Sequence, residues 1–91
     1  MTTTRNLRIT GQVQGVGFRM YMARKARELG VTGWVRNRRD GSVEATVQGN
    51  PAAVEAIIAW AQRGPSSAVV SGVTVTESHG EYAMFETRPT D

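Results

Sequence analysis

The sequence has no cysteine and only one histidine, His79. It therefore offers no disulfide framework, no thiol nucleophile and no sulfur ligand, and a single histidine is too few for a zinc site. The N-terminal stretch MTTTRNLRIT contains no apolar run like that of a signal peptide, and no segment approaches the roughly eighteen apolar residues of a membrane span. We therefore expect a cytoplasmic protein that uses no metal and has no membrane partner.

The composition is otherwise that of an ordinary soluble domain. The chain has 91 residues, of which 40% are hydrophobic and 21% charged, and this predicts one domain over residues 1–91 with a packed core. The formal net charge of +3 favours an anionic partner. The positive residues are spread along the chain, whereas nucleic acid normally meets a denser basic stripe. A small phosphorylated ligand fits this charge better.

Two hydrophobic periods alternate along the chain. A period of two predicts half-buried strands, and a period of 3.6 predicts helices that bury one face. Strands are expected at 6–13, 31–37, 43–48, 69–77 and 82–88, and helices are expected from Phe18 to Gly30 and from Pro51 to Gly64-Pro65.

Short sequence signals mark the ends of these segments. Gly30 stands where a left-handed C-terminal cap is wanted, and Asn50 followed by Pro51 is a good helix start. Asp40-Gly41 predicts a tight turn between two strands. The order β-α-β-β-α-β with a short extra C-terminal strand predicts a ferredoxin-like α+β sandwich, in which an antiparallel sheet carries both helices on one face.

The stretch GQVQGVGFR, from Gly11 to Arg19, joins the first strand to the first helix. Glycine allows positive φ and close approach of a ligand, and the first N–H groups of a helix are unpaired and face anions well. The first and second strands run the same way, so Asn37 leaves the same sheet edge roughly 10 Å away. The spacing brings together backbone donors from Gln14 to Phe18, the guanidinium of Arg19 and the amide of Asn37.

None of these groups is a strong base or a nucleophile. They can stabilise charge and orient a water molecule, which suits a substrate whose leaving group departs without being protonated. Acyl phosphates are such substrates, since their leaving group is a carboxylate.

Two linked segments, GQVQGVGFR and GWVRNRRDGSVE at Gly33 to Glu44, closely resemble the acylphosphatase signature, and the resemblance covers nearly the whole chain. It implies metal-free hydrolysis of acyl phosphates to a carboxylate and inorganic phosphate. Because phosphate is then the product, we expect it also to act as a competitive inhibitor. The resemblance implies that Arg19 binds the phosphate and that Asn37 orients the attacking water. The implied phosphate loop consists of Gln14, Gly15, Val16, Gly17 and Phe18.

The same residues also bear on three other functions. The glycine stretch lacks the third glycine of a dinucleotide fingerprint and the GK[ST] of a nucleotide P-loop. An RNA-binding module shares the β-α-β-β-α-β order, but its stacking aromatics are missing from the first and third strands. A catalytically silent phosphate-binding relative is a third reading, opposed by the presence of Arg19 and Asn37. We expect a monomer without cofactor or nucleic-acid partner, and the natural acyl phosphate stays open.

The remaining conspicuous residues are expected to have ordinary roles. The arginines of the hairpin are interpreted as solvated charges or as steering groups for phosphate. Both tryptophans are expected to pack, and His79 is expected to be inert. The role of Arg88 in the C-terminal tail stays open. The hairpin arginines are Arg36, Arg38 and Arg39, and the tryptophans are Trp34 and Trp60.

Overall fold

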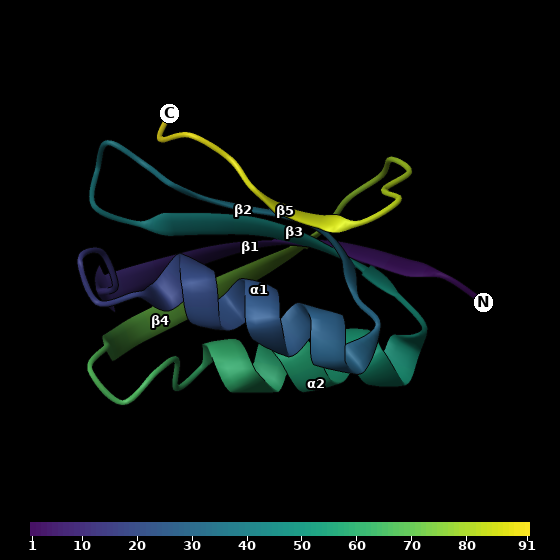
Figure 1. Ribbon diagram of the computed structural model, residues 1–91, viewed down its shortest axis with the longest axis horizontal. Coiled ribbons are helices and arrows are strands. Elements are labelled where there is room, and N and C mark those ends of the chain that lie inside the picture. Colours follow the sequence, from purple (N-terminus) through teal and green to yellow (C-terminus); the bar gives the residue numbers. More distant parts are fainter.

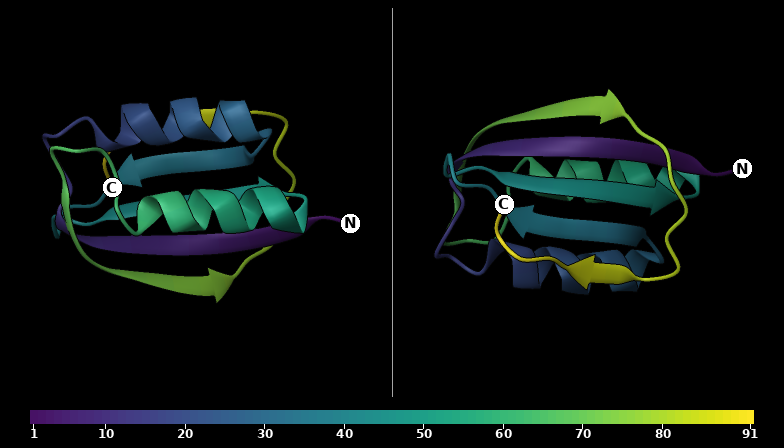
Figure 2. Two further views of the ribbon diagram at one scale, coloured as in Figure 1. Left: turned by 90° about the horizontal axis from the view of Figure 1, so that it is seen from below. Right: turned by 90° about the horizontal axis from the view of Figure 1, so that it is seen from above.

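Five strands form a single sheet in the computed structural model, which describes residues 1–91. The strands are β1 (Thr3–Gln12), β2 (Thr32–Asn37), β3 (Val43–Gly49), β4 (Val69–Glu77) and β5 (Phe85–Thr87). Their order across the sheet is β4-β1-β3-β2-β5, as the right view of Figure 2 shows. Two helices, α1 (Phe18–Leu29) and α2 (Pro51–Ala61), cover one face of the sheet (Figure 1). The predicted ferredoxin-like α+β sandwich is confirmed.

The central strands have the expected topology. β3 lies between β1 and β2 and is antiparallel to both, so that Ile9 and Asn37 pair with the same residue, Val43. One feature differs from the expected antiparallel sheet. β5 pairs in parallel with β2, with Val35 opposite Thr87, so the complete sheet is mixed. β4 ends at the same end of the sheet at which β2 begins. The chain crosses there to the opposite edge, so β5 starts at that end and runs parallel to β2 (Figure 2).

The first and last strands differ most in length from the sequence expectation. β1 starts at Thr3, because Thr3 to Arg5 pair with the end of β3 through their backbones, and such pairing needs no apolar side chain. The last strand is only three residues long. Its Phe85 is buried at 4% exposure, whereas the neighbouring Met84 is 66% exposed.

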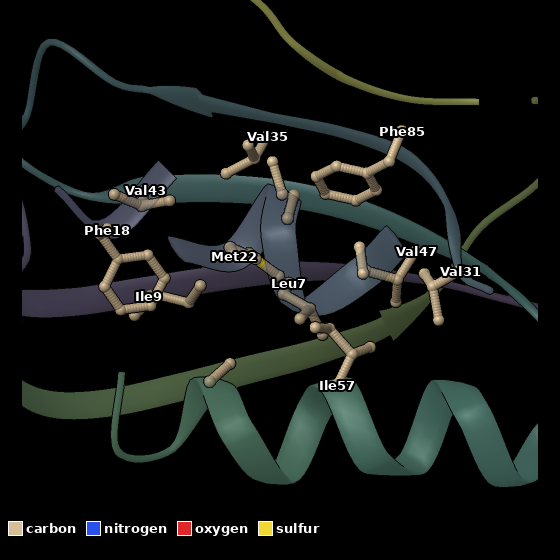
Figure 3. Packing of buried hydrophobic residues seen from close by; sticks show 14 of the residues in the cluster. Leu7, Ile9, Phe18, Met22, Val31, Val35, Val43, Val47, Ile57 and Phe85 are labelled. Atoms are coloured by element: carbon tan, nitrogen blue, oxygen red, sulfur yellow. The ribbon is translucent and has the colours of Figure 1, made fainter. Parts of the chain in front are cut away.

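The core fills the space between the sheet and the two helices (Figure 3). Leu7 and Ile9 point into it from β1, Phe18 and Met22 from α1, and Ile57 from α2, and all five are at most 2% exposed. Each such side chain contributes about 1.5–3 kcal/mol relative to an exposed one. This packing fixes α1 against the sheet and thereby fixes the position of its first turn.

Both helices have the predicted caps. Gly30 adopts φ 74° after α1, and the next amide, that of Val31, donates to the carbonyl oxygen of Ala26 at 2.8 Å. At the start of α2, Asn50 Oδ1 accepts a hydrogen bond from the Ala53 amide at 2.8 Å. Neither helix has both the length and the apolar composition that a membrane crossing requires.

Candidate active site

The loop between β1 and α1 presents its backbone amides without using them. Gly15 and Gly17 have φ values of 75° and 78°, a left-handed conformation that costs other residues about 1–2 kcal/mol. No amide from Gln14 to Gly17 donates to a backbone acceptor, and Gly17, the N-cap of α1, provides no side-chain cap. A turn of this kind followed by a helix N-terminus forms a concave site for an anion.

Two side chains anchor this loop to the body of the protein. The Phe18 ring is 2% exposed and lies 5.3 Å from the ring of Trp60. Val16 packs against the core, and its carbonyl oxygen accepts a hydrogen bond from Ser67 Oγ at 3.1 Å. The loop is therefore held by side chains, while its backbone amides stay unpaired.

A third anchor ties the loop to the hairpin between β2 and β3. The side-chain nitrogen of Gln14 donates to the carbonyl oxygens of Arg38 at 2.7 Å and of Ser42 at 2.9 Å. Sequence reasoning counted Gln14 only for its backbone amide. Its side chain determines how far the glycine loop stands from the end of β2, where Asn37 is located.

An open pocket of about 380 Å³ lies at this end of the molecule and extends along the first three turns of α1. It contains most of the predicted site residues but is not lined by Gln14 or Val16, whose side chains serve as anchors. No carboxylate and no histidine borders it. The lining residues are Val13, Gly15, Gly17, Phe18, Arg19, Met20, Ala23, Arg27, Asn37 and Thr87.

The two predicted catalytic side chains are unpaired within this pocket. Both Arg19 and Asn37 are half-buried. Neither the guanidinium of Arg19 nor the carboxamide of Asn37 makes a hydrogen bond or ion pair within the chain, although most other arginines do. Their hydrogen-bonding groups are available to a ligand in the pocket.

The neighbours of Asn37 in sequence are held on the opposite face of the sheet. Glu44 Oε1 accepts from Arg36 Nη2 at 2.8 Å and from Arg38 Nη1 at 3.0 Å, and Glu44 Oε2 accepts from Asn6. Burial acts to raise the pKa of Glu44, but the hydrogen bonds from Arg36 and Asn6 and the two positive charges outweigh it and lower the pKa. Arg36 and Arg38 are thus paired charges.

The C-terminal segment secures the backbone at the same point. The Asp91 amide donates to the carbonyl oxygen of Asn37, and the Arg39 amide donates to that of Asp91, both at 3.1 Å. Asn37 therefore stands on a backbone that is hydrogen-bonded on both sides, to β3 through Val43 and to the segment after β5.

Sequence reasoning missed two polar residues of the pocket, Arg27 and Thr87. Arg19, Ala23 and Arg27 follow each other at intervals of four, which places them on one face of α1. That spacing was a usable signal. Thr87 comes from β5, and its presence depends on the parallel pairing with Val35, for which the sequence has no local signal.

The residues set aside by sequence reasoning lie outside the pocket. Trp34 is 8% exposed and lies between Arg36 and Arg88, whose guanidinium carbons are 4.9 and 4.8 Å from its ring centroids. Arg88, whose role the sequence left open, therefore stacks on Trp34. His79 is exposed in the turn after β4, which lies at the other end of the sheet from the glycine loop.

Comparison with known proteins shows the family to which this fold belongs. The family model described as acylphosphatase matches residues 5–87. An acylphosphatase of Thiobacillus denitrificans is 58% identical over 85 residues, which cover 93% of this chain and 96% of that relative. One of Thermococcus kodakarensis is 60% identical over 70 residues, 77% of each chain. The solved structure of an acylphosphatase from Coxiella burnetii superposes with a TM-score of 0.92 at 36% identity, covering 96% of this chain and 93% of that one.

The ferredoxin-like sandwich and these similarities define a hydrolase that acts on acyl phosphates. The chain belongs to the acylphosphatase family. Its substrates are accordingly small-molecule acyl phosphates.

Proposed function

We propose that the pocket beside the glycine loop is the active site, where an acyl phosphate is hydrolysed to a carboxylate and inorganic phosphate. One observation carries this assignment: unpaired backbone amides, an unpaired guanidinium at Arg19 and an unpaired carboxamide at Asn37 border the same pocket, and no negative side chain does. Such a site attracts a phosphoryl group and stabilises the charge that develops on it.

The proposed binding mode uses the loop as a cradle. The amides from Gln14 to Phe18 and the guanidinium of Arg19 donate to the non-bridging phosphoryl oxygens, with Arg19 able to make two parallel hydrogen bonds. Because the donors are fixed before the substrate arrives, they need no reorganisation during the reaction. Gln14 and Val16 contribute through their backbone and through the anchoring of the loop.

In the proposed reaction, the side-chain oxygen of Asn37 accepts a hydrogen bond from a water molecule and directs it at phosphorus, in line with the acyl oxygen. The bond between phosphorus and the acyl oxygen breaks, and the carboxylate leaves with the electron pair. The water's oxygen stays on phosphorus with one of its protons, and the other proton passes to a phosphate oxygen, so that the product is dihydrogen phosphate. No protein base is required, since the transition state of phosphoryl transfer is loose and the leaving group is weakly basic.

We also propose that the reaction is independent of metal ions. No histidine, cysteine, aspartate or glutamate borders the pocket, and the chain contains no group of three such residues that could hold a metal. The loop amides and Arg19 take over the neutralisation of phosphoryl charge that a metal supplies in other phosphoryl-transfer enzymes.

We further propose that residues 1–91 act as a single-domain monomer, without nucleic acid. All groups of the pocket come from one chain. The outer face of β1 and β3 carries polar and charged side chains where an RNA-binding sheet needs stacking aromatics. The residues on that face include Asn6, Arg8, Glu44 and Thr46. A cytoplasmic location stays a prediction from composition.

The test is hydrolysis of benzoyl phosphate, followed by ultraviolet absorbance in EDTA. We expect turnover by the wild type and a loss of kcat/KM of at least about 10²-fold in Arg19→Ala and Asn37→Ala, the effect of removing a charge-stabilising donor. Arg63→Ala, at an exposed arginine outside the pocket, is the control for lost charge. Full activity in either pocket variant removes that residue from the mechanism, and loss of wild-type activity in EDTA overturns metal independence.

A further inference from the structure

Two arginines border the pocket at different points along α1. Arg19 lies in the first turn, and Arg27 lies eight residues later on the same face, a rise of about 12 Å along the helix axis. The proposed hydrolysis engages only Arg19 with the phosphoryl group. Arg27 stands about two turns further along the helix.

Arg27 is held in place by β5. Its Nη2 donates to the carbonyl oxygen of Phe85 at 3.3 Å, and no carboxylate lies within ion-pair distance of its guanidinium. A guanidinium has five N–H donors, so this single bond orients the group and leaves other donors for a ligand. The hydroxyl-bearing Thr87 borders the pocket from the same strand.

The pocket also has apolar lining residues. Met20 and Ala23 from α1 and Val13 from the loop border it, and no acidic side chain offsets the charge at either end. The pocket thus combines apolar lining residues with two positive groups that stand about two helical turns apart on α1. A ligand that complements it has an anion at each end of a short carbon skeleton.

We propose that Arg27 binds an anionic group at the far end of the acyl skeleton, so that the enzyme selects acyl phosphates that carry a second negative group such as a carboxylate. This inference rests on the proposed function, because it requires the phosphoryl group to sit in the glycine loop. Arg27 acts on specificity and takes no part in breaking the phosphorus–oxygen bond.

Two matched substrates test the inference. Benzoyl phosphate and 4-carboxybenzoyl phosphate differ only in a carboxylate at the ring position opposite the acyl phosphate. The rigid ring keeps this carboxylate away from the phosphorus of the same molecule. We expect the wild type to favour the carboxylated substrate about fivefold in kcat/KM at low ionic strength, the range of a partly exposed ion pair, and to lose this preference in high salt.

Substitution of Arg27 should remove the preference without slowing the reaction itself. In Arg27→Gln we expect a ratio of about one between the two substrates, with benzoyl phosphate hydrolysed within twofold of the wild-type rate, and Arg27→Lys should recover part of the preference. Arg24→Gln removes the same charge from the same helix outside this pocket, where Arg24 lies over the Tyr21 ring, and should leave the ratio unchanged.

The outcomes are separable. Equal hydrolysis of both substrates by the wild type, or an unchanged ratio in Arg27→Gln, overturns the role of Arg27 while leaving the proposed function in place. An equal loss of activity toward both substrates in Arg27→Gln also overturns it, because that pattern indicates a purely structural arginine. If folded wild type hydrolyses neither substrate, the proposed function fails and this inference fails with it.

Discussion

The side-chain nitrogen of Gln14 lies 2.7 Å from the carbonyl oxygen of Arg38. This hydrogen bond joins the glycine loop to the residue directly after Asn37. It ties the donors proposed to hold the phosphoryl group to the strand end that carries Asn37, the side chain proposed to aim the water, and an error of 1 Å in such an alignment can cost about 10²-fold in rate. We therefore expect Gln14 to act as a positioning residue.

The variant Gln14→Met tests that role. It keeps the length of the side chain and removes both hydrogen bonds, so we expect kcat to fall about tenfold and the free energy of unfolding to fall by about 1 kcal/mol. Competitive inhibition by phosphate should change little, because the loop amides stay in place. Gln12→Met, at an exposed residue two positions away, is the control. An unchanged kcat in a folded Gln14→Met protein contradicts the positioning role.

Gly15 in the glycine loop and Gly30 after α1 form a matched pair for testing the loop backbone. Both have left-handed φ values, 75° and 74°, and an added Cβ would meet no atom within 4 Å at either position. Alanine at each should cost about 1–2 kcal/mol of stability through backbone strain alone. Only Gly15→Ala should also raise KM, because strain there turns amides away from the phosphate. Steady-state kinetics give KM and urea denaturation gives the stability of both variants. Equal KM values would show that the loop backbone at Gly15 takes no part in substrate binding.

The ion-pair network on the outer face predicts a pH dependence of stability. The pKa of Glu44 is lowered from 4.5 on folding, so below that pH the unfolded chain binds more protons than the folded one. The stabilisation is therefore present above about pH 4.5 and is lost as pH falls through the lower folded pKa. Glu44→Gln should lower stability by about 1 kcal/mol at pH 7 and should make the loss of stability below pH 4.5 shallower.

Denaturant unfolding at pH 7, 4.5 and 3 measures this effect. Hydrogen bonds from the Ser42 side chain and amide also lower the pKa of Asp40. Asp40 therefore also loses stabilisation as the pH falls, and it does so in both proteins. Some acid destabilisation therefore persists in Glu44→Gln. Identical pH profiles for the wild type and the variant would show that the Glu44 network contributes nothing to acid stability.

Inorganic phosphate should inhibit competitively, because it is the product and occupies the same cradle. Arg19→Gln should weaken the inhibition about tenfold or more, the effect of losing a charge-assisted hydrogen bond. Asn37→Ala should leave the inhibition constant within about twofold, since Asn37 is proposed to hold water and not phosphate. Steady-state inhibition kinetics distinguish these roles, and noncompetitive inhibition in the wild type would place phosphate outside the loop.

Local sequence signals predicted much of this fold. Gly30 and Asn50 have the predicted roles as caps, because cap preferences depend on the φ of one residue and on hydrogen bonds three or four positions away. The last strand was predicted less well. Its length and parallel direction depend on contact with β2, about fifty residues earlier in the chain.

What the sequence determined by itself is the part of the site built from neighbouring residues. Glycines at positions 15 and 17 permit the left-handed turn, and Phe18 and Arg19 start the helix, so the loop and its first arginine follow from local backbone preferences. The spacing of Arg27 from Arg19 is equally local, although its meaning becomes apparent only when the pocket is seen.

The tertiary structure decided which distant residues complete the pocket. Asn37 reaches the loop through the register of β1, β3 and β2, and Thr87 through the parallel pairing of β5. The Gln14 side chain donates hydrogen bonds to two carbonyl oxygens of the β2–β3 turn. These contacts join residues far apart in the chain, and their geometry is set by the packing of the whole core, which no local pattern encodes.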